Sequence, residues 1–225
     1  MALSFAAQSS IVGRTLAARP QVAARPQARA SVRVAAADRT IWLPSAPLPK
    51  HLDGSLPGDF GFDPLGLGTE PDRLKWYVEA EKTNGRWAMM AVAGILFTEI
   101  TGFAPKWFNV GYETQGDYPL PALIAMEALV MGFIETKRLQ GFKETGKSGF
   151  LNAYPFDPAG MDSPSMAVKE VKNGRLAMVA FVGFSVQALV TRQGPVANLT
   201  SHIGDPFGSN IAANVMNLPQ TLGNQ

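Results

Sequence analysis

The sequence predicts an all-α membrane protein with three transmembrane helices, of which the first and third are long, cross one another and are related by a pseudo-two-fold axis. Three observations support this fold class. Three long segments contain extended apolar stretches, the basic residues gather on one side of those stretches, and the first and third segments repeat one motif. The 225 residues include no cysteine, which excludes disulfide-stapled secreted modules, zinc–thiolate proteins and thiol enzymes.

Residues 1–37 are predicted to be an organelle transit peptide, so that the mature protein comprises residues 38–225. The stretch is rich in alanine and serine, carries arginines and has no acidic residue. The whole chain has 20 basic and 18 acidic residues and a net charge of +2; loss of five leader arginines leaves 15 basic residues and a charge of −3. A basic nucleic-acid-binding protein is therefore not favoured. The alternative is a disordered basic arm that stays attached.

An extended arm is predicted over residues 40–68, which contain too much proline and glycine for a long regular element. Helices follow it. Pro71 suits a first helical position and Gly102 a helix end, while Ser163 suits the cap of a helix that starts at Pro164. The three helices are expected over about 71–102, 121–139 and 163–191.

The apolar half of each helical segment has no polar face opposite its apolar residues, as expected of helices buried on all sides in protein or lipid. Each apolar half alone is shorter than the ~20 residues of a spanning helix. With its polar first half, the first segment has about 32 residues, or roughly 48 Å at 1.5 Å per residue, which is enough to cross a bilayer and project beyond it.

The positions of the basic residues supply an independent argument for a membrane. If all three segments cross, eleven lysines and arginines lie on one side, whereas Lys106 and Arg192 lie on the other. This bias places the N-terminus on the cytoplasm-like side. A soluble helical protein is the alternative, but it gives no reason for the asymmetry. The eleven residues are Arg73, Lys75, Lys82, Arg86, Lys137, Arg138, Lys143, Lys147, Lys169, Lys172 and Arg175.

The first and third segments share the motif Glu-x-x-Asn-Gly-Arg-x-Ala-Met, which begins at Glu81 and again at Glu170. A Phe-Asp-Pro sequence precedes each copy, at Phe62 and at Phe156, so the repeat indicates a duplicated unit of arm and helix. Asn-Gly alone would suggest a hairpin turn, but here it leads twice into an apolar helix pattern. Small residues let membrane helices approach closely. The residues expected at such a crossing are Gly85, Ala88, Gly174 and Ala177.

The charges of the repeat are predicted to pair between helices rather than within one. Glu81 and Arg86 are five residues apart and about 140° apart around a helix, so they do not face each other as i,i+4 partners do. A pseudo-two-fold arrangement instead pairs Glu81 with Arg175 and Glu170 with Arg86. Unpaired charges are costly in a membrane, and these pairs leave one carboxylate oxygen of each glutamate free.

Oxygen-bearing side chains are spread singly along the three segments, which suggests separate ligands for hard cations such as magnesium. Asn84 and Asn173 each follow a repeat glutamate by three residues and share its face. Gln187 lies near the same face as Asn173, about 21 Å further along. Interhelical hydrogen bonding is the alternative for any one of them. The candidates are Glu81, Asn84, Glu127, Glu135, Glu170, Asn173 and Gln187, and Arg138 accompanies the two glutamates of the middle segment.

At these residues the sequence resembles the light-harvesting chlorophyll a/b-binding family. The resemblance covers nearly all of residues 38–225, and it includes the arm at 51–66, both motif copies, the middle glutamates and the tail at 194–206. It implies a chloroplast transit peptide at 1–37 and a chlorophyll a/b-binding domain at 38–225 with three thylakoid membrane helices. It also implies a short amphipathic helix at about 196–204 on the lumenal side, with the N-terminus stromal and the C-terminus lumenal.

The resemblance further implies which side chains hold pigments. Glu127 sits where the family uses Gln or Glu, often through water. Arg86 and Arg175 match the arginines that close the crosswise pairs, whereas Arg138 and Lys169 match positions that touch chlorophyll head groups or lipid. Axial ligands for chlorophyll magnesium are implied at Glu81, Asn84, Glu135, Glu170, Asn173, Gln187 and His202.

Carotenoids are implied by the two Phe-Asp-Pro arms, which match segments that hold the ends of two central carotenoids. Phe62 and Leu74 are the further cofactor contacts expected. The implied cofactors are chlorophyll a, chlorophyll b and the carotenoids lutein, violaxanthin and β-carotene, with phospholipid as a further candidate.

The function implied is a light-harvesting antenna for photosystem I. Asn84 stands where the family more often has histidine, and asparagine there resembles members that serve photosystem I and hold a red-absorbing chlorophyll pair; the arm at 51–59 also resembles that branch. The implied partners are the photosystem I core, neighbouring antenna subunits and thylakoid lipids, and no nucleic acid.

Two closer and one more distant alternative remain open. The closer ones are a photosystem II-type antenna and a photoprotective quenching relative, and the distant one is a transporter or proton relay that uses intramembrane carboxylates. No enzyme is expected, because the sequence has no cysteine, only two histidines and no phosphate-binding loop.

Overall fold

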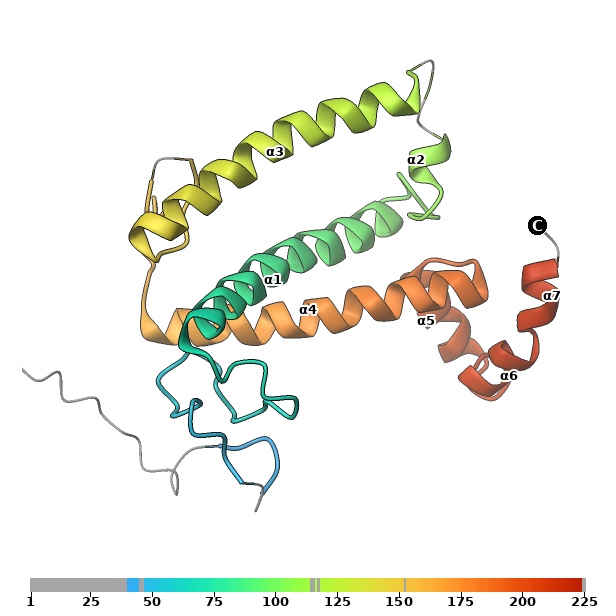
Figure 1. Ribbon diagram of the computed structural model, residues 1–225. Helices are drawn as coiled ribbons and strands as arrows, with labels where there is room; N and C mark the ends of the chain where they lie inside the picture. Colours follow the sequence, from blue (N-terminus) through green and yellow to red (C-terminus); the bar gives the residue numbers. More distant parts are fainter. Residues whose placement is uncertain (1–39, 45–46, 114–115, 117, 152, 224–225) are drawn as a thin grey trace, which may run out of the picture. The chain divides into compact units, whose positions relative to one another are not determined.

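All the regular secondary-structure elements that the structure describes are helices (Figure 1). This computed structural model describes residues 40–44, 47–113, 116, 118–151 and 153–223. The predicted leader at 1–37 lies outside the described residues. Within them, the only β pairing is an isolated bridge between Phe150 and Ala153. The helices are α1 (Pro71–Ile100), α2 (Val110–Glu113), α3 (Leu120–Thr145), α4 (Pro164–Thr191), α5 (Pro195–Gly204), α6 (Ile211–Met216) and α7 (Leu218–Gly223).

The two repeat helices begin where the sequence predicts. α1 starts at Pro71 and α4 at Pro164, where proline is tolerated because the first N–H groups of a helix have no partner within it. The Oγ atom of Ser163 accepts a hydrogen bond from the backbone N–H of Met166 at 3.3 Å and caps α4. α1 ends at Ile100, close to the expected end at residue 102.

The middle helix is longer than the sequence predicts, because α3 continues to Thr145 instead of ending near residue 139. Gly141 does not interrupt it. The ring of Tyr154 packs there so closely that a Cβ atom on Gly141 would lie 1.9 Å from Tyr154 Cζ, and the Tyr154 hydroxyl donates to the carbonyl of Lys137 at 2.8 Å. The helix ends at Gly146, whose φ of 65° is the left-handed conformation that favours glycine.

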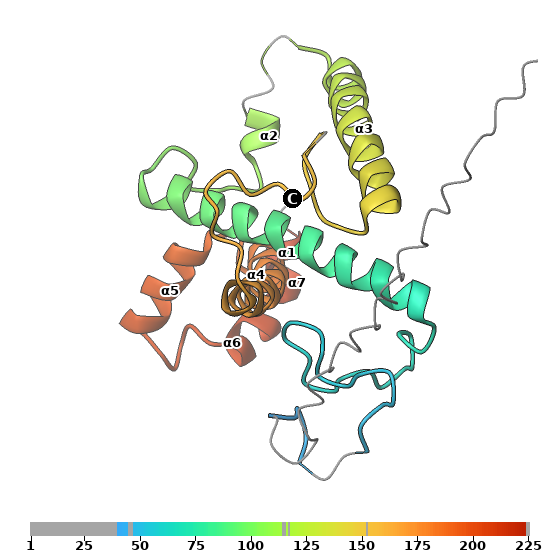
Figure 2. The same cartoon turned by 90° about the vertical axis from the view of Figure 1, so that its left-hand side faces the viewer.

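α1 and α4 lie in close contact (Figures 1 and 2), and the glycines of the repeated motif meet where they cross. A Cβ atom on Gly85 would lie 3.0 Å from Gly174 Cα, and one on Gly174 would lie 3.0 Å from Gly85 Cα. The alanine three residues after the second glycine, Ala177, is also buried. The predicted crossing at small residues is therefore confirmed, and its reciprocal distances fit the predicted pseudo-two-fold relation.

Contacts near the helix ends define the directions of the three long helices. The carboxylate of Glu99, near the end of α1, accepts hydrogen bonds from the N–H groups of Val196 and Ala197, just after α4, so α1 and α4 run the same way. Arg138, in the second half of α3, lies 3.5 Å from Glu79 in the first half of α1, so α3 runs the opposite way. The basic ends of all three helices therefore lie on the same side.

One of the long helices, α4, is long and apolar enough to cross a membrane by length and composition. Charged residues interrupt the other two, including Glu79 and Arg86 in α1 and Glu127 and Glu135 in α3. Three long helices are present as predicted, but the membrane crossing of α1 and α3 stays a prediction.

Large apolar side chains point outward from all three long helices. Met90 in α1 is 72% exposed, Leu129 in α3 is 75% exposed and Leu176 in α4 is 68% exposed. The buried hydrophobic residues of the described part are Ile95, Ala104, Val171, Ala177 and Ala188. Exposed apolar surface on this scale marks faces that other apolar material covers, which fits a chain surrounded by lipid and ligands.

Candidate functional site

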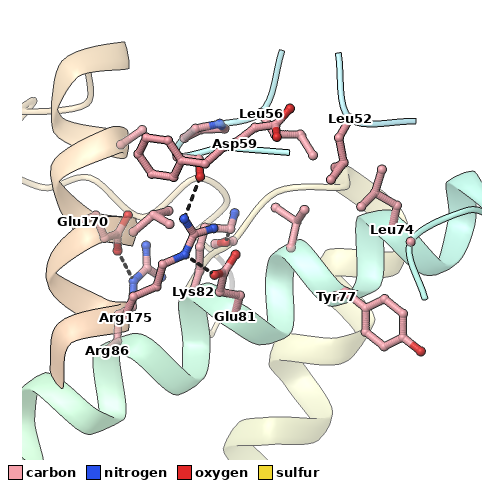
Figure 3. A pocket seen from close by; sticks show the side chains of 18 of the residues that line it. Leu52, Leu56, Asp59, Leu74, Tyr77, Glu81, Lys82, Arg86, Glu170 and Arg175 are labelled. Carbon is pink, nitrogen blue, oxygen red and sulfur yellow. Dashed lines mark hydrogen bonds and ion pairs between the residues drawn. The ribbon is translucent and has the colours of Figure 1, made fainter. Parts of the chain in front are cut away.

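Two crosswise ion pairs join α1 and α4 beside the glycine crossing (Figure 3). The Nε atom of Arg86 lies 2.5 Å from Glu170 Oε1, and the Nε atom of Arg175 lies 2.6 Å from Glu81 Oε1. The prediction of pairing between helices is confirmed. Each glutamate uses one oxygen for its arginine, and the Oε2 atoms have no hydrogen-bond partner among the described residues. The glutamate side chains are about one-third exposed, at 33% for Glu81 and 31% for Glu170.

Arg175 also ties the N-terminal arm to the crossing. Its Nη1 atom donates to the carbonyl oxygen of Gly58 at 2.6 Å, so that one guanidinium holds α1, α4 and the arm together (Figure 3). Gly58 has a φ of 71°, and a Cβ atom there would come within 2.9 Å of Val171 in α4. Only a glycine lets the arm lie this close to α4.

The two Phe-Asp-Pro arms fold into the same local structure, which the sequence repeat predicts in kind but not in detail. Asp63 accepts hydrogen bonds from the N–H groups four and five residues later, those of Leu67 and Gly68. Asp157 does the same with Met161 and Asp162. The glycine three residues after each aspartate has a positive φ, at 65° and 63°. The duplication therefore extends from the sequence to the hydrogen bonds of the loops.

Both arm aspartates are stabilised as carboxylates. The N–H group of Gly68, followed by the imidazole of His51 and the N–H group of Leu67, holds the pKa of Asp63 below its usual value. The N–H groups of Asp162 and Met161 lower the pKa of Asp157 in the same way. His51 belongs to the first arm only, where its Nε2 atom lies 2.7 Å from Asp63.

A cavity of about 1380 Å³ lies between the arms and the first halves of α1 and α4. It exceeds the ~300–1,000 Å³ of ordinary small-molecule pockets. The crosswise pairs form part of its wall, as Figure 3 shows, and so do the two further predicted cofactor contacts, Phe62 and Leu74. The structure thus brings four expected groups together here: the two glutamates, their arginines, the arm and the start of α1.

The predicted amide ligands lie on exposed helix faces. Asn84 is exposed beside the crossing, and Gln187 is exposed near the end of α4. Asn173 is exposed as well, and its Nδ2 atom donates to the carbonyl oxygen of Lys169 at 2.9 Å. That bond directs the Oδ1 atom of Asn173 away from its own helix, where it is available to a ligand. Lys169 itself is exposed.

His202 in α5 is held in the tautomer that a metal ligand needs. Its Nδ1 atom lies 2.7 Å from the carbonyl oxygen of Ser209. A carbonyl oxygen only accepts, so Nδ1 carries the hydrogen and the lone pair of Nε2 is free. His202 and Gln187 line a second cavity of about 440 Å³ among α1, α4 and α5.

The middle helix, α3, also carries a glutamate that pairs with an arginine through one carboxylate oxygen. The Oε2 atom of Glu135 accepts a hydrogen bond from Nε of Arg138 at 2.8 Å and lies 2.6 Å from Nη2, whereas Oε1 has no hydrogen-bond partner among the described residues. Glu127, which precedes Glu135 in the same helix, is exposed and makes no hydrogen bond or ion pair within the described residues. The candidate ligands therefore lie apart from one another. No three His, Asp or Glu side chains of the described residues converge on one point.

Two structurally important glutamates were missed by the sequence reasoning. Glu79 is 2% exposed and lies within ion-pair distance of Lys82 and Arg138. Glu99 binds the first N–H groups of α5. Neither falls in the repeated motif. For Glu99 a signal existed, because it is an acid in an otherwise apolar stretch.

The family follows from a comparison with known sequences. The model of a family described as chlorophyll A-B binding protein matches residues 48–189. The chain belongs to the chlorophyll a/b-binding protein family.

Curated relatives of this family align over most of the chain. Photosystem I chlorophyll a/b-binding protein 5 of Arabidopsis thaliana is 41% identical over 205 residues, which cover 78% of this chain and 80% of the relative. Photosystem I chlorophyll a/b-binding protein 6 of the same plant is 39% identical over 201 residues, covering 77% and 74%. Chlorophyll a-b binding protein P4 of Pisum sativum is 40% identical over 239 residues, covering 96% and 89%.

The side chains of this family member fit chlorophyll as a ligand. The ring of a chlorophyll supplies four nitrogen ligands to its magnesium, so the protein needs to supply only one oxygen or nitrogen for each pigment. Glu81, Glu135 and Glu170 each keep one oxygen free beside an arginine, and His202 keeps one nitrogen free. Single, separated donors of this kind suit many pigments, whereas they would not form a polydentate site for a bare ion.

Proposed function

We propose that the protein is a light-harvesting antenna subunit that binds chlorophyll a, chlorophyll b and carotenoids and passes excitation energy to photosystem I. Membership of the chlorophyll a/b-binding family supports pigment binding. The names of two relatives, which are photosystem I chlorophyll a/b-binding proteins, support the choice of photosystem.

The observation that carries the proposal is the geometry of the crosswise pairs. Each arginine neutralises its glutamate through Oε1 alone, which lowers the cost of the charge in an apolar setting and leaves Oε2 for a ligand. If the pairs served helix packing alone, a two-oxygen contact with the guanidinium would be the more favourable geometry.

The pigments absorb light and exchange excitation when bound; the chain holds and orients them. In this proposal the residues that would ligate chlorophyll magnesium are Glu81, Asn84, Glu135, Glu170, Asn173, Gln187 and His202, and Glu127 would do so through water. The large cavity between the arms and the helices holds carotenoid ends and chlorophyll head groups against Phe62 and Leu74.

We further propose that the three long helices cross the thylakoid membrane. The shared side of their basic ends supports a stromal N-terminus and a lumenal C-terminus. α5 then lies at the lumenal surface, where its apolar face rests against the membrane. Protease added to the stromal face of intact thylakoids should cleave the arm at 40–68 and spare residues 195–223.

A charge-swap experiment tests ligation separately from ion pairing. The double variant Arg86→Glu with Glu170→Arg keeps a pair across the crossing but removes the carboxylate from position 170. Purified in mild detergent, it should hold one chlorophyll fewer per chain than the wild type. The single variant Arg86→Leu is the control, because it breaks the pair and keeps the ligand.

Two outcomes would contradict the proposal. A swapped variant with the full chlorophyll content would show that Glu170 is not a ligand. A native preparation of the wild type without any chlorophyll would remove the antenna function and favour a transporter, which would instead show ion-dependent flux.

Asn84 provides the test of the photosystem I assignment. Asn84→His replaces an amide oxygen with an imidazole nitrogen as the ligand, which alters the position of the pigment and its coupling to a neighbour. The low-temperature fluorescence emission of the antenna should shift to the blue. Unchanged emission would contradict a red-absorbing pair at this site.

A further inference from the structure

We propose that Glu79 is a positioning residue for the pigment site on α3: it holds Arg138 in place so that Glu135 keeps one carboxylate oxygen for magnesium. The inference rests on the proposed function, because it requires Glu135 to ligate a chlorophyll. It concerns a residue outside the repeated motif and outside all the predicted ligands.

Glu79 is a buried acid whose charge is fully compensated. It is 2% exposed, and it is the largest fully buried side chain of the described residues. Its Oε2 atom lies 3.1 Å from Lys82 Nζ and accepts a hydrogen bond from the hydroxyl of Ser148. Its Oε1 atom lies 3.5 Å from Arg138 Nη1. Burial of these charges costs desolvation free energy, which the ion pairs offset only in part. We therefore expect the network to have a role beyond stability.

Arg138 has two sides that serve different partners. Its Nη1 atom faces α1, where Glu79 Oε1 and the Oγ1 atom of Thr83, at 3.3 Å, accept from it. Its Nε and Nη2 atoms face Glu135 and both bind the same oxygen, Oε2. The contacts on the first side fix the rotation of the guanidinium and hence the one-oxygen contact on the second.

Loss of Glu79 would release that rotation. A free guanidinium binds a carboxylate preferentially through two parallel hydrogen bonds, one to each oxygen. Arg138 would then occupy Oε1 of Glu135 as well and compete with magnesium for it. Lys82 and Arg138 would also lose their shared counter-charge, so Arg138 would turn more strongly toward Glu135.

A separate contact keeps α3 near α1 without this network. The rings of Trp76 in α1 and Phe142 in α3 meet edge to face, with centroids 6.0 Å apart. α3 therefore keeps a contact with α1 that does not involve Arg138, which lets an experiment distinguish positioning from packing.

The test uses the full mature chain, purified with its pigments, and compares absorption spectra. Glu135→Leu first identifies the band of the α3 chlorophyll as a difference from the wild type. Glu79→Gln should reduce the absorbance of that same band by at least half, or shift its wavelength, and leave the other bands unchanged. Glu70→Gln is the matched control: it removes the same charge from an exposed glutamate that pairs with Arg73, and it should leave every band unchanged.

Two further variants keep the proposal testable. Thr83→Val removes the other acceptor of Arg138 Nη1 without burying an unpaired charge, and it should weaken the same band by a smaller amount. Trp76→Leu loosens α3 without touching Arg138, and it should broaden several bands. In a Glu135→Leu background, Glu79→Gln should change the spectrum no further, as expected of residues that act in series.

The outcomes separate this inference from the function on which it rests. If the wild type holds chlorophyll but Glu79→Gln and Thr83→Val leave the Glu135 band intact, the positioning role is wrong and the antenna function stands. If Glu79→Gln instead broadens several bands, as expected for Trp76→Leu, the residue acts through helix packing and the positioning role is wrong. If the wild type holds no chlorophyll, the proposed function falls and this inference falls with it.

Discussion

Two glycines determine how closely α1 and α4 approach. At Gly85, an added methyl group would lie 3.0 Å from a backbone atom of the facing helix, and backbone cannot rotate aside as a side chain does. We expect Gly85→Ala to push the helices apart and to destabilise the pigment-loaded protein by about 1–3 kcal/mol, the usual cost of overpacking. The temperature at which pigment is lost on heating measures this effect.

Gly94→Ala is the control for that prediction. Gly94 lies in the same helix, and an added Cβ atom there has nothing within 4 Å. Alanine favours a helix over glycine by roughly 0.5–1 kcal/mol, so this variant should be as stable as the wild type or slightly more so. Equal destabilisation by both variants would mean that the crossing does not depend on close approach.

The arm responds to pH through Asp63. The N–H group of Gly68 lowers the pKa of this carboxyl in the folded protein, so its contribution to stability is present above its unfolded pKa, about 4, and is lost as pH falls through the lower folded value. At neutral pH, Asp63→Asn should therefore speed hydrogen exchange at the Leu67 and Gly68 amides. The difference from the wild type should shrink as the pH falls below about 4. If the difference in exchange rate between the two proteins does not depend on pH, the effect of Asp63→Asn comes from altered hydrogen-bond geometry and not from loss of the negative charge.

At the scale of elements, Glu99 attaches α5 to the end of α1. Its two oxygens accept from Val196 and Ala197 at 3.0 and 2.9 Å, where the first N–H groups of a helix lack partners. Glu99→Leu should weaken the start of α5 by about 1 kcal/mol, as loss of a helix cap does, and hydrogen exchange at those two amides should rise.

Glu99→Gln separates charge from hydrogen bonding in this contact. Glutamine keeps one acceptor oxygen but loses the favourable interaction of a negative charge with the helix N-terminus. Exchange at Val196 and Ala197 should lie between the values for the wild type and Glu99→Leu. If exchange is unchanged in both variants, Pro195 and the packing of α5 against α4 hold the helix without Glu99.

The sequence predicted the elements that local rules govern. Proline and serine at the helix starts predicted α1 and α4, and the repeat predicted their crossing and its ion pairs. The length of α3 was wrong by several residues, because Tyr154 fills the space beside Gly141 and no local rule reveals that contact. The short helices α2, α6 and α7 were not predicted, since four to six residues carry too little periodicity to detect.

The sequence predicted the candidate-site residues that belong to the repeated motif, but it did not predict Glu79. Residues of the motif were found because they occur twice, and the free oxygens of Glu81 and Glu170 follow from the pairing argument. Glu79 was missed because its burial depends on Arg138 and Ser148, which lie far away in the sequence and which only the fold brings to it. A buried acid outside a repeat has no local signature.

At the scale of the whole molecule, α1 and α4 contact each other directly, whereas α3 makes few contacts with either. Apolar side chains such as Leu129 in α3 and Val179 in α4 are mostly exposed, and the described contacts of α3 with α1 are few and largely polar. We expect removal of the pigments to loosen α3 from α1 and α4 while the α1 and α4 crossing persists.

Distance measurements between spin labels test this expectation in the loaded and pigment-free protein. One pair of labels, at exposed positions 90 and 179, reports on α1 and α4, and another, at 90 and 129, reports on α1 and α3. The first distance should stay narrow in both states, whereas the second should broaden without pigment. If both broaden together, the crossing itself depends on pigment.

The reciprocal crossing of α1 and α4 has a consequence for shorter chains. Each repeat unit supplies one glycine, one glutamate and one arginine; the two glycines contact each other, and each glutamate pairs with the arginine of the other unit. Such a self-complementary surface is the defining property of an isologous interface. A polypeptide with a single copy of the unit would carry both halves of the contact, so that two identical chains could form the same crossing as a symmetric homodimer.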